Sequence, residues 1–230
     1  MLRRRLTLNV LAAVLVALLL ALAGAGCGGD DDGGDSAAAG KRNEGAEKAF
    51  LTAMVSHHES ALDMAKIAEQ RGKDPFITQL AKDIGSTQAR EIAEMKQIYA
   101  RRLGGRLKPD PGGHDGLGLT AAEAGMTHSP ETSEKLRSAD PFDRAFVDEM
   151  VPHHRGAIRM ANVVLKKTDD ASLRKLARAI IATQEREIEE MNDFRTKEFG
   201  GPVPAGAGHG MPSGGGTPAE EPDHRGQHPG

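Results

Sequence analysis

The chain has 230 residues and a formal net charge of -3, from 30 Lys and Arg against 33 Asp and Glu. This length suits one domain of ordinary size with tails, and the interspersed charge excludes the basic stripe of nucleic-acid-binding proteins, so no nucleic-acid partner is expected. Gly and Pro gather at the start, middle and end of the chain and leave two blocks rich in Ala, Leu, Ile, Met, Glu, Lys and Arg, without Trp. This helix-forming composition predicts an all-α fold.

The N-terminal segment, 1–27, has the layout of an export signal. Three arginines at 3–5 precede an apolar run over 10–23, which leads through small residues to Cys27. That order is typical of a secretory signal peptide, and the single cysteine after small residues resembles the lipobox of bacterial lipoproteins. We therefore expect cleavage before Cys27, a lipid anchor on it and a location on the outer face of the cytoplasmic membrane. Simple secretion and an uncleaved membrane helix over 6–25 are the alternatives.

Both ends of the mature chain are predicted to lack structure. Residues 28–42 are rich in Gly, Asp and Ala and predict a flexible acidic tether, and residues 201–230 are rich in Gly, Pro and His and predict a disordered tail. Because Cys27 is the only cysteine, no disulfide framework is available, and the stability of the fold has to come from packing.

Two copies of one helix hairpin make up the predicted core, residues 43–200. Residues 49–104 align with residues 145–200 without a gap, and more than a third of the aligned positions are identical. A duplication is the simplest explanation. Each copy, 43–104 and 141–200, is predicted to form two helices. A helix pair cannot bury its apolar face alone, so the two pairs are expected to stack as a ferritin-like four-helix bundle.

Proline and glycine mark the expected helix ends. The Asp-Pro pairs at 74–75 and 140–141 are typical of an N-cap residue before a proline in the first helical turn. The Gly-Gly pairs at 104–105 and 200–201 are typical of the residues that close a helix.

The crossover between the repeats, 105–140, is rich in Gly and Pro. A short helix is expected to begin there at Thr120, with Glu123 completing its capping signal. Weaker candidate copper ligands outside the core are Met126, His128, His209, Met211, His224 and His228.

Each repeat carries a Met-x-x-His-His motif on its first predicted helix. At 100° per residue these side chains fall on one inward-facing stripe. The second helix of each repeat carries a glutamate and a methionine on its own apolar stripe. Burying an ionised Glu or a pair of imidazoles is unfavourable unless they are paired or coordinate a metal. The set is Met54, His57, His58, Glu91 and Met95 in the first repeat, and Met150, His153, His154, Glu187 and Met191 in the second.

This donor set predicts a transition-metal site. Imidazole nitrogen suits copper, zinc, iron and nickel, whereas the soft thioether sulfur favours copper, especially Cu(I). Two other interpretations stay open: the methionines can simply fill gaps in the core, and Glu91 and Glu187 can hold protonated histidines in an ion-pair network without a metal. Adjacent histidines also diverge by 100°, so one of each pair can orient the other instead of binding the metal.

The repeats differ just before their histidine pairs, where Pro152 stands in the second and Ser56 in the first. A proline inside a helix removes a hydrogen bond, so we expect a bend before His153. The two halves are therefore not expected to be perfectly symmetric.

A family resemblance is carried by the repeated motif M-V-x-H-H-x-x-A-x-x-M-A, followed by T-Q-x-x-E-I-x-x-M. Over residues 43–200 the chain resembles the Domain-of-Unknown-Function 305 family, which implies a ferritin-like four-helix bundle, usually exported, with some members implicated in copper binding and resistance. The family motif often has Pro before its histidine pair, so Pro152 matches it and Ser56 departs from it. The ligands that the resemblance implies are Met54, His57, His58, Met64 and Met95, with Met150, His153, His154, Met160 and Met191.

The sequence therefore predicts an exported protein that binds, buffers or hands on copper at the cell surface without turnover. One alternative is a di-iron or di-manganese oxidoreductase, although the repeats lack the Glu-x-x-His spacing of carboxylate-bridged sites. The other is a metal-free interaction scaffold whose polar residues are locked in ion pairs.

Overall fold

The computed structural model describes residues 33–206, so the predictions for the signal segment, Cys27 and the tail beyond 206 lie outside the described residues. The described part of the chain is all-α, as predicted, and contains no β-strand. None of its helices is long and apolar enough to cross a membrane. In chain order the elements are α1 (Gly33–Arg71), α2 (Pro75–Arg102), the 3-10 helix η1 (Gly113–Leu117), α3 (Pro130–Ser138), α4 (Phe142–Leu165) and α5 (Ala171–Phe199).

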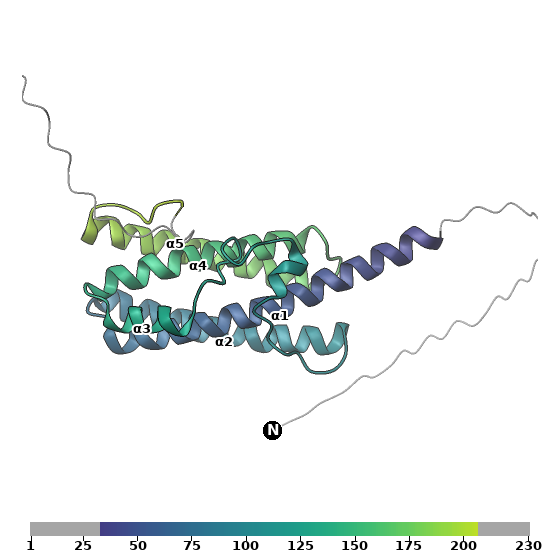
Figure 1. Ribbon diagram of the computed structural model, residues 1–230, viewed down its shortest axis with the longest axis horizontal. Helices are drawn as coiled ribbons and strands as arrows, with labels where there is room; N and C mark the ends of the chain where they lie inside the picture. The colour runs from purple at the N-terminus through teal and green to yellow at the C-terminus, as the bar shows by residue number, and fades with distance from the viewer. Residues whose placement is uncertain (1–32, 207–230) are drawn as a thin grey trace, which may run out of the picture.

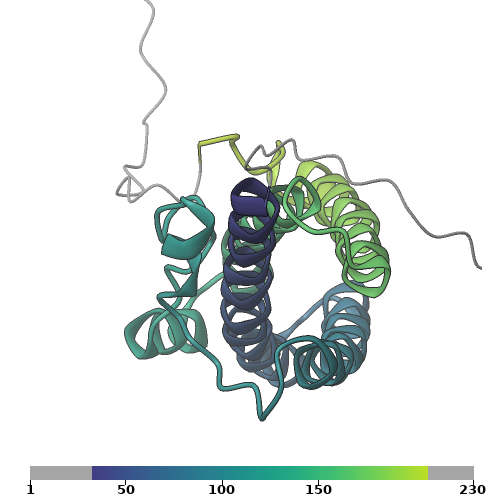
Figure 2. The ribbon, with the colours of Figure 1, turned by 90° about the vertical axis from the view of Figure 1, so that its right-hand side faces the viewer.

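The four long helices lie side by side as two hairpins (Figure 1). Helix α1 packs on α2 and α4 packs on α5, so that each sequence repeat spans one hairpin. The hairpins meet through contacts of α1 with α4 and of α2 with α5. Seen end-on, the crossover with η1 and α3 lies to one side of this arrangement, outside α1 (Figure 2). Its elements pack on α1 and α4.

Side-chain caps fix the starts of α2 and α5. Asp74 caps α2 as predicted, with its Oδ1 accepting the backbone N–H of Phe76 at 2.8 Å. At the equivalent position of the second repeat, Asp170 caps α5. The N-cap predicted at Asp140 is wrong, because Pro141 has an extended backbone and the helix begins after it.

Two other boundaries differ from the predicted ones. Helix α1 begins at Gly33, inside the stretch predicted as a tether, so residues 33–42 have helical backbone. The first tail residues pack on the protein: Val203 is buried, and Arg155 donates to its carbonyl oxygen at 3.1 Å. The tail predicted as disordered from residue 201 therefore begins with a segment that packs on the helices through Val203.

The predicted helix at Thr120 is also wrong. Thr120 and Glu123 do form a reciprocal capping box, with hydrogen bonds of 2.9 and 3.2 Å between each backbone N–H and the other side chain. The chain makes only a turn there, because Gly125 follows with a positive φ of 67°. The α-helix of the crossover lies later, where Ser129 caps α3.

Two apolar clusters fill the space between the long helices. On α1, residues 50–55 belong to one cluster and residues 61–68 to the other, with the first histidine pair between them. On α4 the order is reversed, with residues 142–151 in the second cluster and residues 157–164 in the first. The same alternation on α2 and α5 places buried polar residues between the clusters on all four helices.

Candidate metal site

Eight buried side chains form a polar layer between the two apolar clusters. Every member is at most 8 % exposed, and each long helix contributes two of them. Apolar clusters lie on both sides of the layer, so its members need partners within the layer, in the backbone, in a neighbouring polar side chain or in a ligand. The layer consists of His57, His58, Gln88, Glu91, His153, His154, Gln184 and Glu187.

The second histidine of each pair hydrogen-bonds the glutamate of its own hairpin. Nε2 of His58 lies 2.8 Å from Oε2 of Glu91, and Nε2 of His154 lies 2.7 Å from Oε2 of Glu187. With the carboxylate as acceptor, each imidazole donates its Nε2–H. A carboxylate that holds one ring nitrogen leaves the other for a metal. Glu91 and Glu187, predicted as ligands, thus occupy positions from which they orient histidines.

The first histidines of the two repeats meet at the centre of the layer. The ring centroids of His57 and His153 are 3.6 Å apart, with 38° between the ring planes. Ser60 fixes the tautomer of His153, because its single hydroxyl proton goes to the His57 carbonyl oxygen at 2.8 Å. The Ser60 oxygen must then accept Nε2–H of His153, also at 2.8 Å. When neutral, His153 therefore has a bare lone pair on Nδ1.

His57 reaches the same tautomer through a different contact. Its Nε2 lies 3.1 Å from the carbonyl oxygen of His153, and since a carbonyl only accepts, Nε2–H donates. The contacts differ because Gly156 replaces Ser60 in the second repeat and offers no hydroxyl. The two halves are thus unequal for a reason besides Pro152, which lies inside the continuous helix α4. The bend expected at Pro152 stays a prediction.

Burial keeps the two central imidazoles neutral. The pKa values of His57 and His153 lie well below the ordinary value of 6.5, mainly because burial disfavours the charged ring. Neighbouring histidines of the layer lower both values further. Since the neutral imidazole is the form that binds metals, both rings are ready to act as ligands without losing a proton.

Four ring nitrogens of the layer are buried without a hydrogen-bond partner. An unpaired buried polar atom costs about 1–3 kcal/mol, so such atoms in a folded protein call for a ligand or another explanation. On the two central rings the unpaired atom carries a lone pair, which is the donor that a transition metal takes. The chemistry of the layer therefore fits a metal ion. The atoms are Nδ1 of His57, His58, His153 and His154.

Methionine sulfur is available on both sides of the layer. All six methionines predicted as ligands in the core are buried, and each apolar cluster contains two from one repeat and one from the other. They fill the core and also place thioether sulfur on both sides of the histidines along the helices. Core filling and metal binding are therefore compatible roles for these residues. One cluster holds Met54, Met95 and Met160, and the other holds Met64, Met150 and Met191.

Two layer residues, Gln88 and Gln184, were not predicted from the sequence. Each is buried, and neither the amide nitrogen nor the amide oxygen has a hydrogen-bond partner. Both stand three residues before the layer glutamate, at a spacing that places side chains on the same face of a helix. The repeated Thr-Gln pair was the signal that could have identified them.

The predicted histidines and glutamates come together as a layer, not as a closed coordination shell. Among residues 33–206, no three His, Cys, Asp or Glu side chains gather in a group that could hold a metal ion. What the structure brings close are paired imidazoles oriented by Glu, Ser and backbone groups, with Met and Gln from the neighbouring turns.

Several solved structures resemble this fold. CopM in the Cu(I)-bound form is 30 % identical, with a TM-score of 0.56, covering 67 % of this chain and 98 % of CopM. CopM structures in Cu(II)-bound and Ag-bound forms match similarly, each with a TM-score of 0.55. A DUF305 protein from Streptomyces coelicolor is 25 % identical with a TM-score of 0.60, covering 69 % of this chain and 95 % of that chain.

Sequence comparison gives the family. An uncharacterised protein of Acanthamoeba polyphaga mimivirus is 45 % identical over 56 residues, which are 24 % of this chain, and the match spans only 37 % of the viral protein's length. Residues 47–195 match the family described as Domain of unknown function (DUF305). That match includes the whole polar layer and extends over more than half of the chain, and the chain therefore belongs to the DUF305 family.

Proposed function

We propose that this protein binds copper, as Cu(I), in the polar layer and buffers it or confers resistance to it at the cell surface. The observation that carries the proposal is the set of buried, unpaired Nδ1 atoms, of which those of His57 and His153 are bare lone pairs. Methionine sulfur lies in both adjoining clusters. Imidazole with thioether is a soft donor set, which favours Cu(I) over harder ions.

The similarity to CopM supports the choice of metal. CopM structures contain Cu(I), Cu(II) or Ag, and Cu(I) and Ag(I) are both soft ions. For the fold we propose the ferritin-like four-helix type, which the pairing of α1 with α4 and of α2 with α5 supports. This class of fold says nothing by itself about iron chemistry.

For the location we propose export and a lipid anchor on Cys27, at the outer face of the cytoplasmic membrane. The support is the order of arginines, apolar run and lone cysteine in the sequence. Metabolic labelling with a radioactive fatty acid should mark the wild-type protein and leave a Cys27→Ser variant unlabelled. Equal labelling of the two proteins would contradict the anchor, and absence of label from both would favour simple secretion.

Thermal melting with Cu(I) tests metal binding by the layer. A ligand at about 100 times its dissociation constant stabilises the native state by about 2.7 kcal/mol. For a domain of this size we expect Cu(I) to raise the melting temperature of the full chain by about 5–10 °C. The double variants His57→Ala/His58→Ala and His153→Ala/His154→Ala should each lose most of this rise, because the central rings of both repeats are in contact.

The matched control is His114→Ala in the crossover. Its ring lies outside the polar layer, and Nδ1–H donates to the Leu119 carbonyl oxygen at 2.9 Å. This variant should keep the rise. No rise in the wild type, or the same rise in both double variants, would contradict copper binding and favour the metal-free scaffold. Oxygen consumption that depends on added ferrous iron would favour the oxidoreductase.

A further inference from the structure

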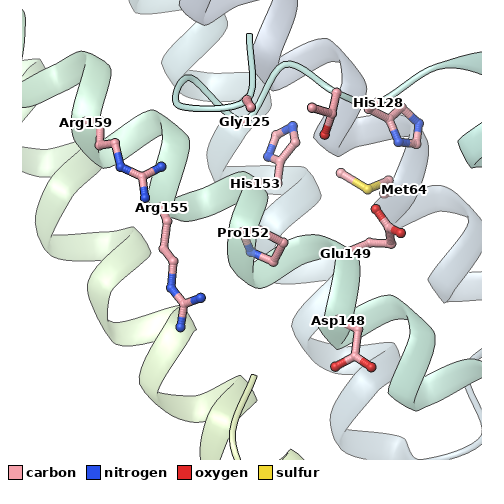
Figure 3. A pocket seen from close by; sticks show the side chains of 11 residues that line it. Met64, Gly125, His128, Asp148, Glu149, Pro152, His153, Arg155 and Arg159 are labelled. Atoms are coloured by element: carbon pink, nitrogen blue, oxygen red, sulfur yellow. The ribbon is translucent and has the colours of Figure 1, made fainter. Parts of the chain in front are cut away.

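A small cavity lies between the crossover and α4 and reaches one side of the polar layer (Figure 3). Its volume is about 70 Å³, enough for a metal ion with little accompanying water. Met64 of α1, His128 of the crossover and His153 of α4 line it. Of the four layer histidines, only His153 has any exposed surface, 4 %, while the other three are at 0 %. The cavity is therefore a route by which solvent meets the layer.

Two glycines bring the crossover close enough to build this cavity. A Cβ on Gly156 would lie 2.3 Å from the backbone carbonyl of Ala124, and a Cβ on Gly125 would lie 2.8 Å from the carbonyl oxygen of His153. The loop thus rests directly on the helix backbone at the position where the first repeat has Ser60. This packing fixes the segment that carries His128 beside His153, as Figure 3 shows.

The donors of the cavity are held in the same way as those of the layer. Nε2 of His128 lies 2.8 Å from the Ser133 hydroxyl, just as Nε2 of His153 lies 2.8 Å from the Ser60 hydroxyl. In both rings Nδ1 is buried and has no hydrogen-bond partner. The Met64 side chain is 1 % exposed. Met64 and His128 line the same cavity (Figure 3).

The lining of the cavity carries two carboxylates, Asp148 and Glu149, and two arginines, so its formal charges balance. The Glu149 carboxylate lines the wall near Met64 (Figure 3). The two arginines of the lining are engaged by backbone carbonyls: Arg155 donates to Pro204 and Arg159 to Glu123, at 2.8 and 2.9 Å. The soft donors of the cavity, and not its charge, therefore favour a soft cation.

We infer that this cavity is a second metal site, an outer site for Cu(I) or Ag(I) formed by Met64 and His128, from which the ion passes to His153 of the layer. The inference builds on the proposed copper binding and adds a ligand from the crossover, His128. With this outer site the two repeats differ in function. The layer opens to the cavity through His153 of the second repeat, whereas His57 of the first repeat is fully buried.

Competition with a chromophoric Cu(I) chelator tests the outer site on the full chain, without oxygen and in the presence of ascorbate. We expect His128→Ala to bind one Cu(I) ion fewer per chain than the wild type. Met64→Leu, which keeps the core volume, should lose the same ion. Thr127→Ala is the matched control, because Thr127 lines the same cavity and has no soft donor. It should bind as many ions as the wild type.

The outcomes separate this inference from the proposed function. If the wild type takes up no Cu(I), copper binding itself is wrong. If the wild type binds Cu(I) and both His128→Ala and Met64→Leu bind the same number of ions with the same affinity, the outer site is wrong and the layer remains the only metal site proposed. Unchanged far-ultraviolet circular dichroism of His128→Ala and Met64→Leu ensures that a lost ion reports a lost ligand.

Discussion

Acidification below about pH 6.5 is expected to lower the free energy of unfolding of the metal-free protein, because of His57 and His153. Their pKa values in the folded state lie well below 6.5, whereas in the unfolded chain they return to that value. Between the two values the unfolded state binds more protons, so the free energy of unfolding falls as the pH falls. Each group contributes up to about 1.4 kcal/mol per pH unit, and the two together about 2.7 kcal/mol.

Urea unfolding at a series of pH values between about 5 and 7 measures this slope. The double variant His57→Gln/His153→Gln keeps neutral polar groups in the layer and removes the titration, so its free energy of unfolding should depend much less on pH. Copper should be removed beforehand, since a bound metal would compete with protons for Nδ1. If the free energy of unfolding of the double variant falls with pH as steeply as that of the wild type, His57 and His153 are not the cause of the acid sensitivity.

Gly156→Ala is expected to destabilise the protein by about 2–3 kcal/mol, even though alanine favours helices. The new Cβ would lie 2.3 Å from the carbonyl carbon and oxygen of Ala124, and 2.4 Å from the backbone nitrogen of Gly125. Backbone atoms cannot move aside as a flexible side chain can, so the crossover would have to leave α4. The loss should appear as a lower urea midpoint.

Gly85→Ala in α2 is the matched control for this change. Gly85 also lies inside a long helix, but a Cβ there would meet only Glu69 Oε1, at 3.9 Å. The same substitution should therefore stabilise the protein, by about 0.5–1 kcal/mol, through the helix preference of alanine alone. Equal effects of the two substitutions on the free energy of unfolding would show that the close approach of the crossover to α4 does not affect stability.

Local features of the sequence predicted the helices and the faces they bury. Residues three and four apart share a helix face, so the histidine pair and the glutamate of each repeat could be placed inward from spacing alone. The N-cap at Asp74 followed in the same way, since a cap involves residues close in the chain. The prediction failed at Asp140, where Asp143 instead accepts the backbone N–H groups of Lys73 and Asp74 at 2.9 and 2.8 Å. That contact joins the loop between α1 and α2 to the first turn of α4, which are distant in sequence.

By itself, the sequence determined an all-α chain with a repeated Met-x-x-His-His motif and an inward glutamate in each repeat, because these depend only on composition and helical period. The tertiary structure decided which residues meet. It placed the His57 ring against the His153 ring, gave each central imidazole a donating Nε2–H and a bare Nδ1, and divided the methionines between two clusters. Helical period fixes the face of a residue but not its depth against another helix. Ser60 and Gly156, unremarkable in the sequence, therefore decide the hydrogen bonds of the layer and the position of the loop that carries His128.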